Sequence, residues 1–331
     1  MSEKNTTDEI DFTSKSSFQN VMNKAKRKQT VKYFIITTIT TIFLLTVIYL
    51  GSQQIIEKRR ANDDSLNYSL IHGANTYQSG SPMGSSDDSN LFSYTEEIAY
   101  WKRIGDRDIL WSTKSVTTPL FGKRKINGSG TETLIFSERE KRYVNFNQLN
   151  GEREIEFYFP QLTYTYLPKE LSAATELDNN KIVEVALSFE KPLSLQEASK
   201  ILGTDNVNWL WVDTSTEAQV NEFKKEALKM ENERQVITKS GASAYGFEVL
   251  DSDFEIGGQY FLNIIKTLSL DGNYQNKVKK LANDINEKSS PKVSDIRISG
   301  AVVTGTPKEL ERFNNIDIIR TSVIGATVDI Y

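Results

Sequence analysis

The pattern of apolar and polar positions divides the chain into one long apolar stretch and a much longer region of short alternating runs. Residues 33–56 contain no charged side chain, and a helix of that length reaches about 36 Å at about 1.5 Å per residue. This is more than the roughly 30 Å hydrocarbon core of a bilayer, and no other stretch of the chain is as long and apolar. The pattern therefore predicts a single transmembrane helix over residues 33–56.

A short amphipathic pattern precedes this span. Its apolar residues recur at positions i, i+3, i+4 and i+7, which places them on one face of a helix: Phe18, Val21, Met22 and Ala25. Residues 1–32 hold no core that this face could cover, so we expect an external partner. The composition favours the lipid bilayer surface, because neighbouring basic residues attract anionic lipid. The alternative is a cytoplasmic protein with an apolar groove, in which Phe18 and Met22 would be the anchors.

Charge is distributed unevenly around the span. The N-terminal flank has a basic cluster with no acidic residue in it, made of Lys24, Lys26, Arg27, Lys28 and Lys32. On the C-terminal flank, residues 58–60 are basic, but acidic neighbours offset them. By the positive-inside rule, residues 1–32 are expected in the cytoplasm and the region after the span outside the cell. A cleaved signal peptide fits less well, because the basic region and the apolar run are both too long.

After the span, the sequence changes character. Residues 57–90 are rich in Ser, Asn, Asp and Gly, which predicts an extracellular tether. Over residues 91–175 short apolar runs alternate with turn signals, and Ile155, Phe157 and Phe159 recur at every second position. This pattern predicts a β-rich extracellular region.

Residues 180–331 alternate strand and helix patterns, which is typical of an α+β domain. Two units, beginning near Ile182 and near Ile296, share the order strand, capping box, helix, strand. Each capping box pairs a hydroxyl residue with a glutamate three positions later: Ser194 with Glu197, and Thr306 with Glu309. Right-handed crossovers would make the two strands of a unit parallel if they are neighbours or near-neighbours. Helical periodicity marks three further helices, near residues 220–230, 260–270 and 278–285.

The predicted fold class is therefore α+β. It combines a single N-terminal transmembrane helix, a β-rich membrane-proximal extracellular region and a C-terminal α+β domain with βαβ units.

Composition narrows the possible functions. The 331 residues carry a formal net charge of −4, and residues 1–32 contribute +3 from seven basic and four acidic groups, which leaves −7 for the rest. An acidic exterior argues against direct nucleic-acid binding. The chain has no cysteine and one histidine, His72, so we expect no disulfide, no metal site, no Ser-His-Asp triad and no cofactor. A large exported region without disulfides suits a Gram-positive cell surface.

An anchored enzyme and an exported cell-surface binding module are the two alternatives. Several carboxylates could serve acid–base chemistry, but no spacing singles out a pair: Asp205, Asp213, Glu248, Asp251, Asp253 and Glu255. We therefore expect no enzyme activity and assign no catalytic residue. Trp209 and Trp211, with Tyr164 and Tyr166, could contact a wall polymer or a peptide, although aromatic residues at strand spacing are typical of a core.

Two separated segments carry a resemblance to a known family. The first is residues 18–60, with a short helix, a basic run, a single span and a basic exit. The second is a spaced pattern in the C-terminal domain: residues 185–189 with Lys191 and Pro192, residues 207–213, residues 245–247, residues 302–307 with Glu309 and Leu310, and residues 324–329. In this order the segments resemble the sigma factor regulator proteins of Gram-positive bacteria, which are similar to membrane-bound anti-sigma factors.

The resemblance implies a protein of transcription regulation and signal transduction. A cytoplasmic segment would hold an extracytoplasmic-function sigma factor at the membrane through the apolar face at residues 18–25, which reverses the preference for lipid. The outer domain would report cell envelope stress, and assembly with a second small membrane protein stays open. The tail lacks the zinc-type cluster of histidine and cysteine found in better-understood anti-sigma factors, so only the short helix remains to bind the sigma factor.

Overall fold

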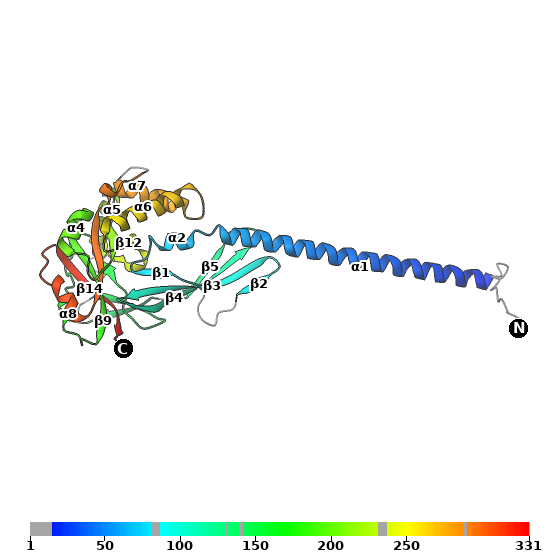
Figure 1. The fold of residues 1–331 in the computed structure, drawn as a ribbon, viewed down its shortest axis with the longest axis horizontal. Coiled ribbons are helices and arrows are strands. Elements are labelled where there is room, and N and C mark those ends of the chain that lie inside the picture. Colours follow the sequence, from blue (N-terminus) through cyan, green and yellow to red (C-terminus); the bar gives the residue numbers. More distant parts are fainter. Residues whose placement is uncertain are drawn as a thin grey trace.

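One long helix projects from a folded body in which the described residues form two five-stranded β-sheets and two smaller strand pairs (Figure 1). The computed structural model describes residues 15–80, 87–129, 132–138, 142–230, 237–286 and 290–330. Its secondary structure is mixed α and β, which confirms the predicted fold class.

The long helix, α1, runs from Lys15 to Ala61 without a break. The predicted short helix and the predicted span are therefore one element, because residues 18–50 contain no glycine or proline that would interrupt it. Its 47 residues extend about 70 Å at about 1.5 Å per residue. The helix is long and apolar enough to cross a membrane, and none of its most apolar 18-residue window is buried within the protein.

The C-terminal end of the predicted span differs from the expectation. All side chains over residues 33–50 are exposed, whereas Ser52 is 2% exposed and Ile56 is 1% exposed. The helix meets the folded body at these two positions. The freely exposed apolar run therefore ends near Leu50, and the last part of the predicted span packs against the protein itself.

The predicted tether at residues 57–90 also differs from the expectation. It contains the end of α1, the short helix α2 (Ser65–Ser69) and the strands β1 (Thr76–Gln78) and β2 (Asp88–Asn90). Tyr68 and Ile71 are buried in the main core, and Ala74 is buried in a second cluster. The burial of these three side chains could not be predicted from a segment of mainly polar composition. Each of them is held by contacts with residues far away in the chain. Residues 81–86 lie outside the described part.

The first sheet has the strand order β1-β3-β4-β5, with β2 paired to β3, and all its pairs are antiparallel. Its long hairpin consists of β3 (Ser93–Ile104) and β4 (Arg107–Pro119), and β5 (Lys125–Ser129) follows. Gly105 makes the hairpin turn with a φ of +63°, a conformation that glycine adopts without strain. The hairpin extends beside the end of α1 (Figure 1).

Two smaller strand pairs complete the expected β-rich region. One is the hairpin of β6 (Glu132–Ser137) and β7 (Arg142–Asn147). The other pairs β8 (Glu156–Phe157) with the distant β11 (Lys239–Ser240). The alternating segment around Phe157 lies against the C-terminal sheet, with both Phe157 and Tyr158 at 0% exposure. Phe157 and Tyr158 are thus both buried although they are adjacent in the chain, whereas Glu156 is half-buried.

The second sheet has the order β12-β10-β13-β9-β14, and every neighbouring pair is antiparallel. Its strands are β9 (Lys181–Leu193), β10 (Val207–Val212), β12 (Gly246–Glu248), β13 (Ile298–Gly305) and β14 (Ile319–Asp329). Because β13 lies between β9 and β10, those two strands are parallel near-neighbours. β13 and β14 are likewise parallel near-neighbours, because β9 lies between them. The two predicted units are therefore interleaved, in a split βαβ arrangement of the ferredoxin-like kind.

Helices cover one face of this sheet. They are α3 (Leu171–Thr175), α4 (Leu195–Leu202), α6 (Phe254–Leu270), α7 (Gln275–Asn286) and α8 (Pro307–Leu310). The main core lies beneath them, and one face of β9, formed by Val183, Val185, Leu187 and Phe189, is fully buried in it. Both predicted capping boxes are present, at Ser194 with α4 and at Thr306 with α8.

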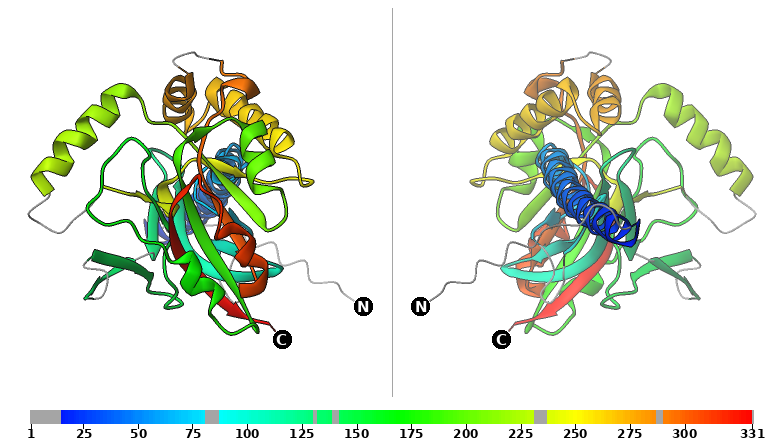
Figure 2. Two further views of the ribbon diagram at one scale, coloured as in Figure 1. Left: turned by 90° about the vertical axis from the view of Figure 1, so that its left-hand side faces the viewer. Right: turned by 90° about the vertical axis from the view of Figure 1, so that its right-hand side faces the viewer.

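The remaining elements lie around this core. Helix α5 (Glu217–Met230) stands at the side of the body in the views of Figure 2. Three short 3-10 helices occupy Gly241–Ser243, Val293–Asp295 and Glu311–Phe313. The second face of the sheet packs Trp209 and Trp211 against Phe157 and its neighbours.

Candidate functional site

The first candidate site is the apolar face near the start of α1. Phe18 is 52% exposed, Val21 is 44% exposed and Met22 is 43% exposed, and Ala25 is exposed as well. These residues lie on consecutive turns of a helix that continues into the apolar span. Among the described residues none covers this face, so it stands free as a possible contact surface.

The basic cluster that follows this face is also solvent-exposed. All five of its side chains lie on α1 and are exposed: Lys24, Lys26, Arg27, Lys28 and Lys32. Phe18 stands about 22 Å from Tyr33 along the helix axis, at about 1.5 Å per residue. The apolar face is therefore held well away from the start of the apolar run by a rigid basic segment.

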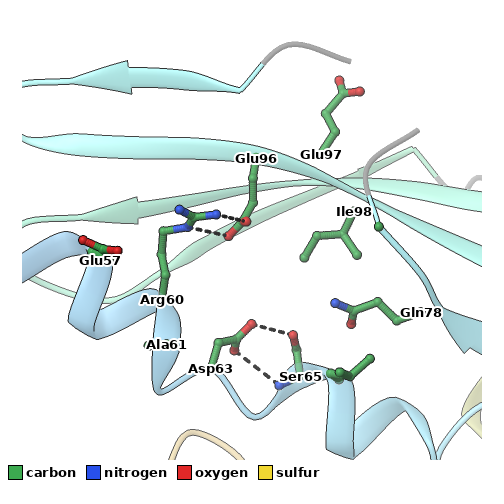
Figure 3. Close-up of a pocket in the computed structure, with 11 residues that line it drawn as sticks. Glu57, Arg60, Ala61, Asp63, Ser65, Gln78, Glu96, Glu97 and Ile98 are labelled. Carbon is green, nitrogen blue, oxygen red and sulfur yellow. Dashed lines mark hydrogen bonds and ion pairs between the residues drawn. The ribbon is translucent and has the colours of Figure 1, made fainter. Parts of the chain in front are cut away.

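The second candidate site is the junction between the other end of α1 and the first sheet. The Arg60 guanidinium lies 2.8 Å from the Glu96 carboxylate of β3 and 3.7 Å above the ring of Tyr94. Figure 3 shows this pair together with Asp63, which turns toward Ser65. Arg124 forms an ion pair with Asp63 and lies 3.7 Å from Glu96. Four alternating charges thus join the helix to the sheet.

A neighbouring arginine fixes the helix to the end of the hairpin. The Arg59 guanidinium donates hydrogen bonds to the backbone carbonyls of Pro119 (2.6 Å) and Leu120 (2.8 Å). One and a half turns earlier, the Gln53 amide donates to the carbonyl of Asn90 at 3.1 Å. Asn90 and Pro119 both pair with Ser93 at the start of β3, so residues 53–59 of the helix lie against this end of the sheet.

The junction encloses a cavity of about 420 Å³. Its charged lining is mainly acidic and comes from α1, from the segment that follows it and from β3: Glu57 and Arg60, Asp63, and Glu96 and Glu97. Arg60 and Glu96 neutralise one another, and Glu97 points away from both of them (Figure 3). The cavity belongs to the helix–sheet contact and has no apolar lining patch large enough to define a ligand.

The far end of the hairpin is tied to the second sheet by a buried ion pair. Lys102 of β3 and Glu184 of β9 are 2% and 0% exposed, and their charged atoms lie 2.9 Å apart. Glu184 also accepts hydrogen bonds from the Asn75 amide (3.1 Å) and the Ala326 backbone N–H (3.2 Å). Buried charges persist only when they are paired and hydrogen-bonded in this way. The hairpin is therefore fastened at both ends, to α1 and to the C-terminal sheet.

The single histidine lies in an aromatic cluster instead of a metal site. His72 stacks on Tyr68, with ring centroids 4.9 Å apart, and meets Tyr245 edge-on at 5.0 Å. Burial lowers the pKa of His72 to about 4, and the nearby ammonium groups of Lys239, Lys114 and Lys277 act in the same direction. Within the described ranges no group of three histidine or carboxylate residues could hold a metal ion.

Several of the carboxylates that could have supported an enzyme have structural partners, and the two tryptophans that could have supported a binding module are buried. Asp253 caps α6, Asp213 accepts a hydrogen bond from Gln161 at 3.0 Å, and Glu248 faces Arg103 at 3.4 Å. Trp209 and Trp211 are 4% and 2% exposed. These tryptophans form part of the core and present no surface to a wall polymer.

The sequence predicted that residues 58–60 flank the membrane span, but it did not predict their contact with the first sheet. It treated residues 58–60 only as charges near the membrane, whereas the structure pairs two of them with the first sheet. The contacts join positions 36 residues apart for Arg60 and Glu96 and about 60 apart for Arg59 and Pro119. The sequence shows that basic residues 58–60 have acidic residues available to pair with, but it does not show which acidic residue pairs with which basic one.

Comparison with known families gives a match to the C-terminal part of the chain. Residues 175–326 match the family described as sigma factor regulator C-terminal. This range runs from the end of α3 to the middle of β14 and so includes both interleaved βαβ units. Comparison with curated proteins and with solved structures gives no match. Residues 175–326 are therefore similar to the C-terminal domain of sigma factor regulators.

Proposed function

We propose that the protein is a single-pass membrane anti-sigma factor whose N-terminal segment sequesters a sigma factor of the extracytoplasmic-function class. The family implies a sigma factor as the partner, and the apolar N-terminal helix is consistent with a membrane anchor. In this proposal residues 1–32 are cytoplasmic, and the folded body lies outside a Gram-positive cell, where it responds to envelope stress. The observation that carries the proposal is the exposed apolar face of Phe18, Val21 and Met22 on an unbroken α1.

The continuity of α1 favours a protein partner over the lipid surface. To lie on the membrane, the face at residues 18–25 would need a bend between itself and the span. The sequence between Ala25 and Tyr33 has no glycine or proline to make one. A straight helix instead carries Phe18 about 22 Å away from Tyr33, into the aqueous phase. A groove on a cytoplasmic protein can reach that position, and a flat bilayer cannot.

The apolar face at residues 18–25 is short, but its burial supplies enough free energy to bind a partner protein. Burial of Phe18, Val21 and Met22 contributes about 1.5–3 kcal/mol each before the costs of ordering. Those costs are reduced, because the residues already belong to a helix that extends from the span. Confinement to the membrane also raises the effective concentration of the site.

The junction supports a route for the signal. In the proposal, α1 continues without interruption from the sigma-binding face, through the bilayer, to the contacts of Arg59 and Arg60 with the first sheet. The hairpin then reaches the C-terminal sheet through Lys102 and Glu184. A change outside could therefore move or rotate the helix as a rigid rod.

The proposal is tested by capture with the full chain. The protein is placed in nanodiscs and incubated with lysate of its host, and bound proteins are identified by mass spectrometry. We expect a sigma factor on the wild type and none on Phe18→Asp, because the substitution puts a charge into an apolar contact. Asn20→Asp is the matched control, since it adds the same charge to the opposite face of the helix. A sigma factor that binds equally to Phe18→Asp contradicts the assignment of the face.

A further inference from the structure

We propose that the end of the first sheet nearest the span, formed by the two turns that carry Phe92 and Phe121, inserts into the outer-leaflet surface of the bilayer. The inference rests on the proposed role of α1 as a membrane span. It adds a second membrane contact, made by the folded body, to the single helix that anchors the chain.

The two turns expose large apolar side chains side by side. Phe92 is 58% exposed and lies between β2 and β3, and Phe121 is 79% exposed and lies between β4 and β5. The Leu120 backbone N–H donates to the Phe92 carbonyl at 2.7 Å, so the two turns are joined. Water is an unfavourable surrounding for two such phenyl rings, and exposed apolar groups in one place mark a contact surface.

The register between the sheet and α1 shows which way these turns face. Arg60 contacts Glu96 within β3, and Arg59 contacts Pro119 at the end of β4. Gln53, nearer the span, contacts Asn90 at the end of β2. Asn90 and Pro119 both pair with Ser93, the first residue of β3, so Gln53 and Arg59 meet the sheet at the start of β3, whereas Arg60 meets it three residues further along the strand. The turns form the end of the body that lies closest to the exposed apolar run, as Figure 1 also shows.

The distance along the helix places the turns in the headgroup layer. The exposed apolar run ends near Leu50, and Gln53 lies about 4.5 Å beyond it at about 1.5 Å per residue. The polar layer on each side of the hydrocarbon core is about 5–8 Å thick. Asn90, which is hydrogen-bonded to Gln53, therefore lies at the depth of that layer when α1 spans the membrane, and Phe92 follows two residues later. The Phe121 turn is held beside Phe92 by the Leu120–Phe92 hydrogen bond, while its contact with Arg59 begins about 13.5 Å beyond Leu50 along the helix, at about 1.5 Å per residue. Aromatic side chains at this depth are stabilised, because their rings leave water while the backbone stays hydrated.

The charges near the turns indicate that apolar contact dominates over electrostatic attraction. Lys58 and Lys123 are exposed there, but so are Asp87 and Asp88. The Arg59 guanidinium is already occupied by backbone carbonyls. We therefore expect insertion to occur on neutral lipid as well and to depend little on salt.

The test uses the absence of cysteine from the chain, which allows one labelled position at a time. Full-length Phe121→Cys and Phe92→Cys are labelled with an environment-sensitive fluorophore and placed in vesicles of zwitterionic phosphatidylcholine. Quenching by spin-labelled lipid is compared with quenching by aqueous iodide. Leu228→Cys is the matched control, because Leu228 is an exposed apolar residue on α5, 73% exposed. Phe43→Cys, within the apolar run, reports whether α1 is in the bilayer.

We expect the lipid quencher to reduce the fluorescence at positions 92 and 121 at least twofold more than at position 228, and iodide to show the reverse order. Quenching at 121 by iodide alone, with position 43 quenched by lipid, overturns the insertion while leaving the span intact. Protection at 121 from both quenchers assigns the turns to a protein contact and also overturns it. If position 43 is not quenched by lipid, the span and the insertion fail together.

Discussion

At the residue scale, the buried pair of Lys102 and Glu184 is the contact that joins the two sheets. Both side chains are almost fully buried and their charged atoms lie 2.9 Å apart. The Lys102 ammonium also lies 4.0 Å above the ring of Trp111. Sequence analysis could not find this pair, because the partners are 82 positions apart and each stands in a strand with many charged neighbours.

Removal of one partner is expected to be far more damaging than removal of both. Lys102→Met leaves the Glu184 carboxylate buried without its cation, and we expect a loss of about 3–5 kcal/mol in the free energy of unfolding. Lys102→Met combined with Glu184→Leu removes both charges, so the loss should be smaller than for the single substitution. Chemical denaturation of the three proteins measures this. A single variant within about 1 kcal/mol of wild type contradicts the account of the pair.

His72 makes the stability of the body depend on pH in a defined window. In the folded protein, burial first and then Lys239, Lys114 and Lys277 lower the pKa of His72 to about 4, whereas in the unfolded chain the group titrates near about 6.5. The unfolded state therefore binds a proton first as the pH falls. The contribution of His72 is fully present above pH 6.5 and is lost progressively as the pH falls through 6.5 to 4.

The corresponding variant is His72→Phe, which keeps the ring stacked on Tyr68. We expect wild type to lose about 1–3 kcal/mol relative to the variant between pH 7 and pH 4. Thermal unfolding of both proteins at a series of pH values gives the difference, in which the titration of other groups cancels. Parallel curves for the two proteins across this window would refute the pKa assigned to His72.

At the scale of the elements, local signals in the sequence located several helices and strands well. The capping boxes at Ser194 and Thr306 were visible because a hydroxyl residue and a glutamate three positions on satisfy each other's backbone donors. The fully apolar face of β9 was equally visible as an alternation of Val183, Val185, Leu187 and Phe189. Such features depend only on residues within one turn or one strand.

The arrangement of these elements was less predictable. The parallel relation of β9 and β10 followed from the crossover rule, but the insertion of β13 between them depends on a strand nearly a hundred residues later. Residues 57–90 were predicted to be a tether, because the contacts that order Tyr68 and Ile71 come from distant parts of the chain. The composition of a segment indicates only its average solvent exposure. It does not reveal that three of its apolar side chains are buried.

The two caps should contribute to stability independently. Ser194→Ala and Thr306→Ala each remove the acceptor for a backbone N–H at the start of a helix, and we expect a loss of about 1 kcal/mol for each. The effects should add in the double variant, since the caps belong to different helices. Urea unfolding gives the three values. Ser194→Asp, which retains an acceptor, should stay near wild type, and a loss as large as that of Ser194→Ala would contradict the role of the hydroxyl.

At the scale of the whole molecule, the structure combines one rigid helix and one hairpin into a continuous unit. Arg60 and Glu96 join them at the junction, with Arg124 and Asp63 beside them. The sequence predicted the span, its basic flank and the apolar face at residues 18–25. It predicted the helix as far as residue 56 but not the contact that residues 53–60 make with the sheet, because that contact depends on the tertiary position of β3 and β4.

The junction is expected to loosen when its central ion pair is removed. Arg60 and Glu96 are partly exposed, 32% and 20%, so Glu96→Gln should weaken the contact by at most about 1 kcal/mol. Hydrogen exchange of the backbone amides of residues 52–63, in the full chain in nanodiscs, should accelerate by up to about fivefold. Glu97→Gln is the control, because Glu97 points away from Arg60 (Figure 3). Equal exchange in both variants would show that the pair does not hold the helix.

The distribution of the sigma factor between membrane and cytosol in living cells shows whether the apolar face of α1 holds it. Host cells express the wild-type chain, Phe18→Asp or Asn20→Asp at equal levels, and the sigma factor identified by capture is quantified in each fraction. We expect the sigma factor to sediment with the membrane for wild type and Asn20→Asp, and to move to the cytosol for Phe18→Asp. A sigma factor that stays with the membrane in cells with Phe18→Asp contradicts the claim that the apolar face of α1 holds it.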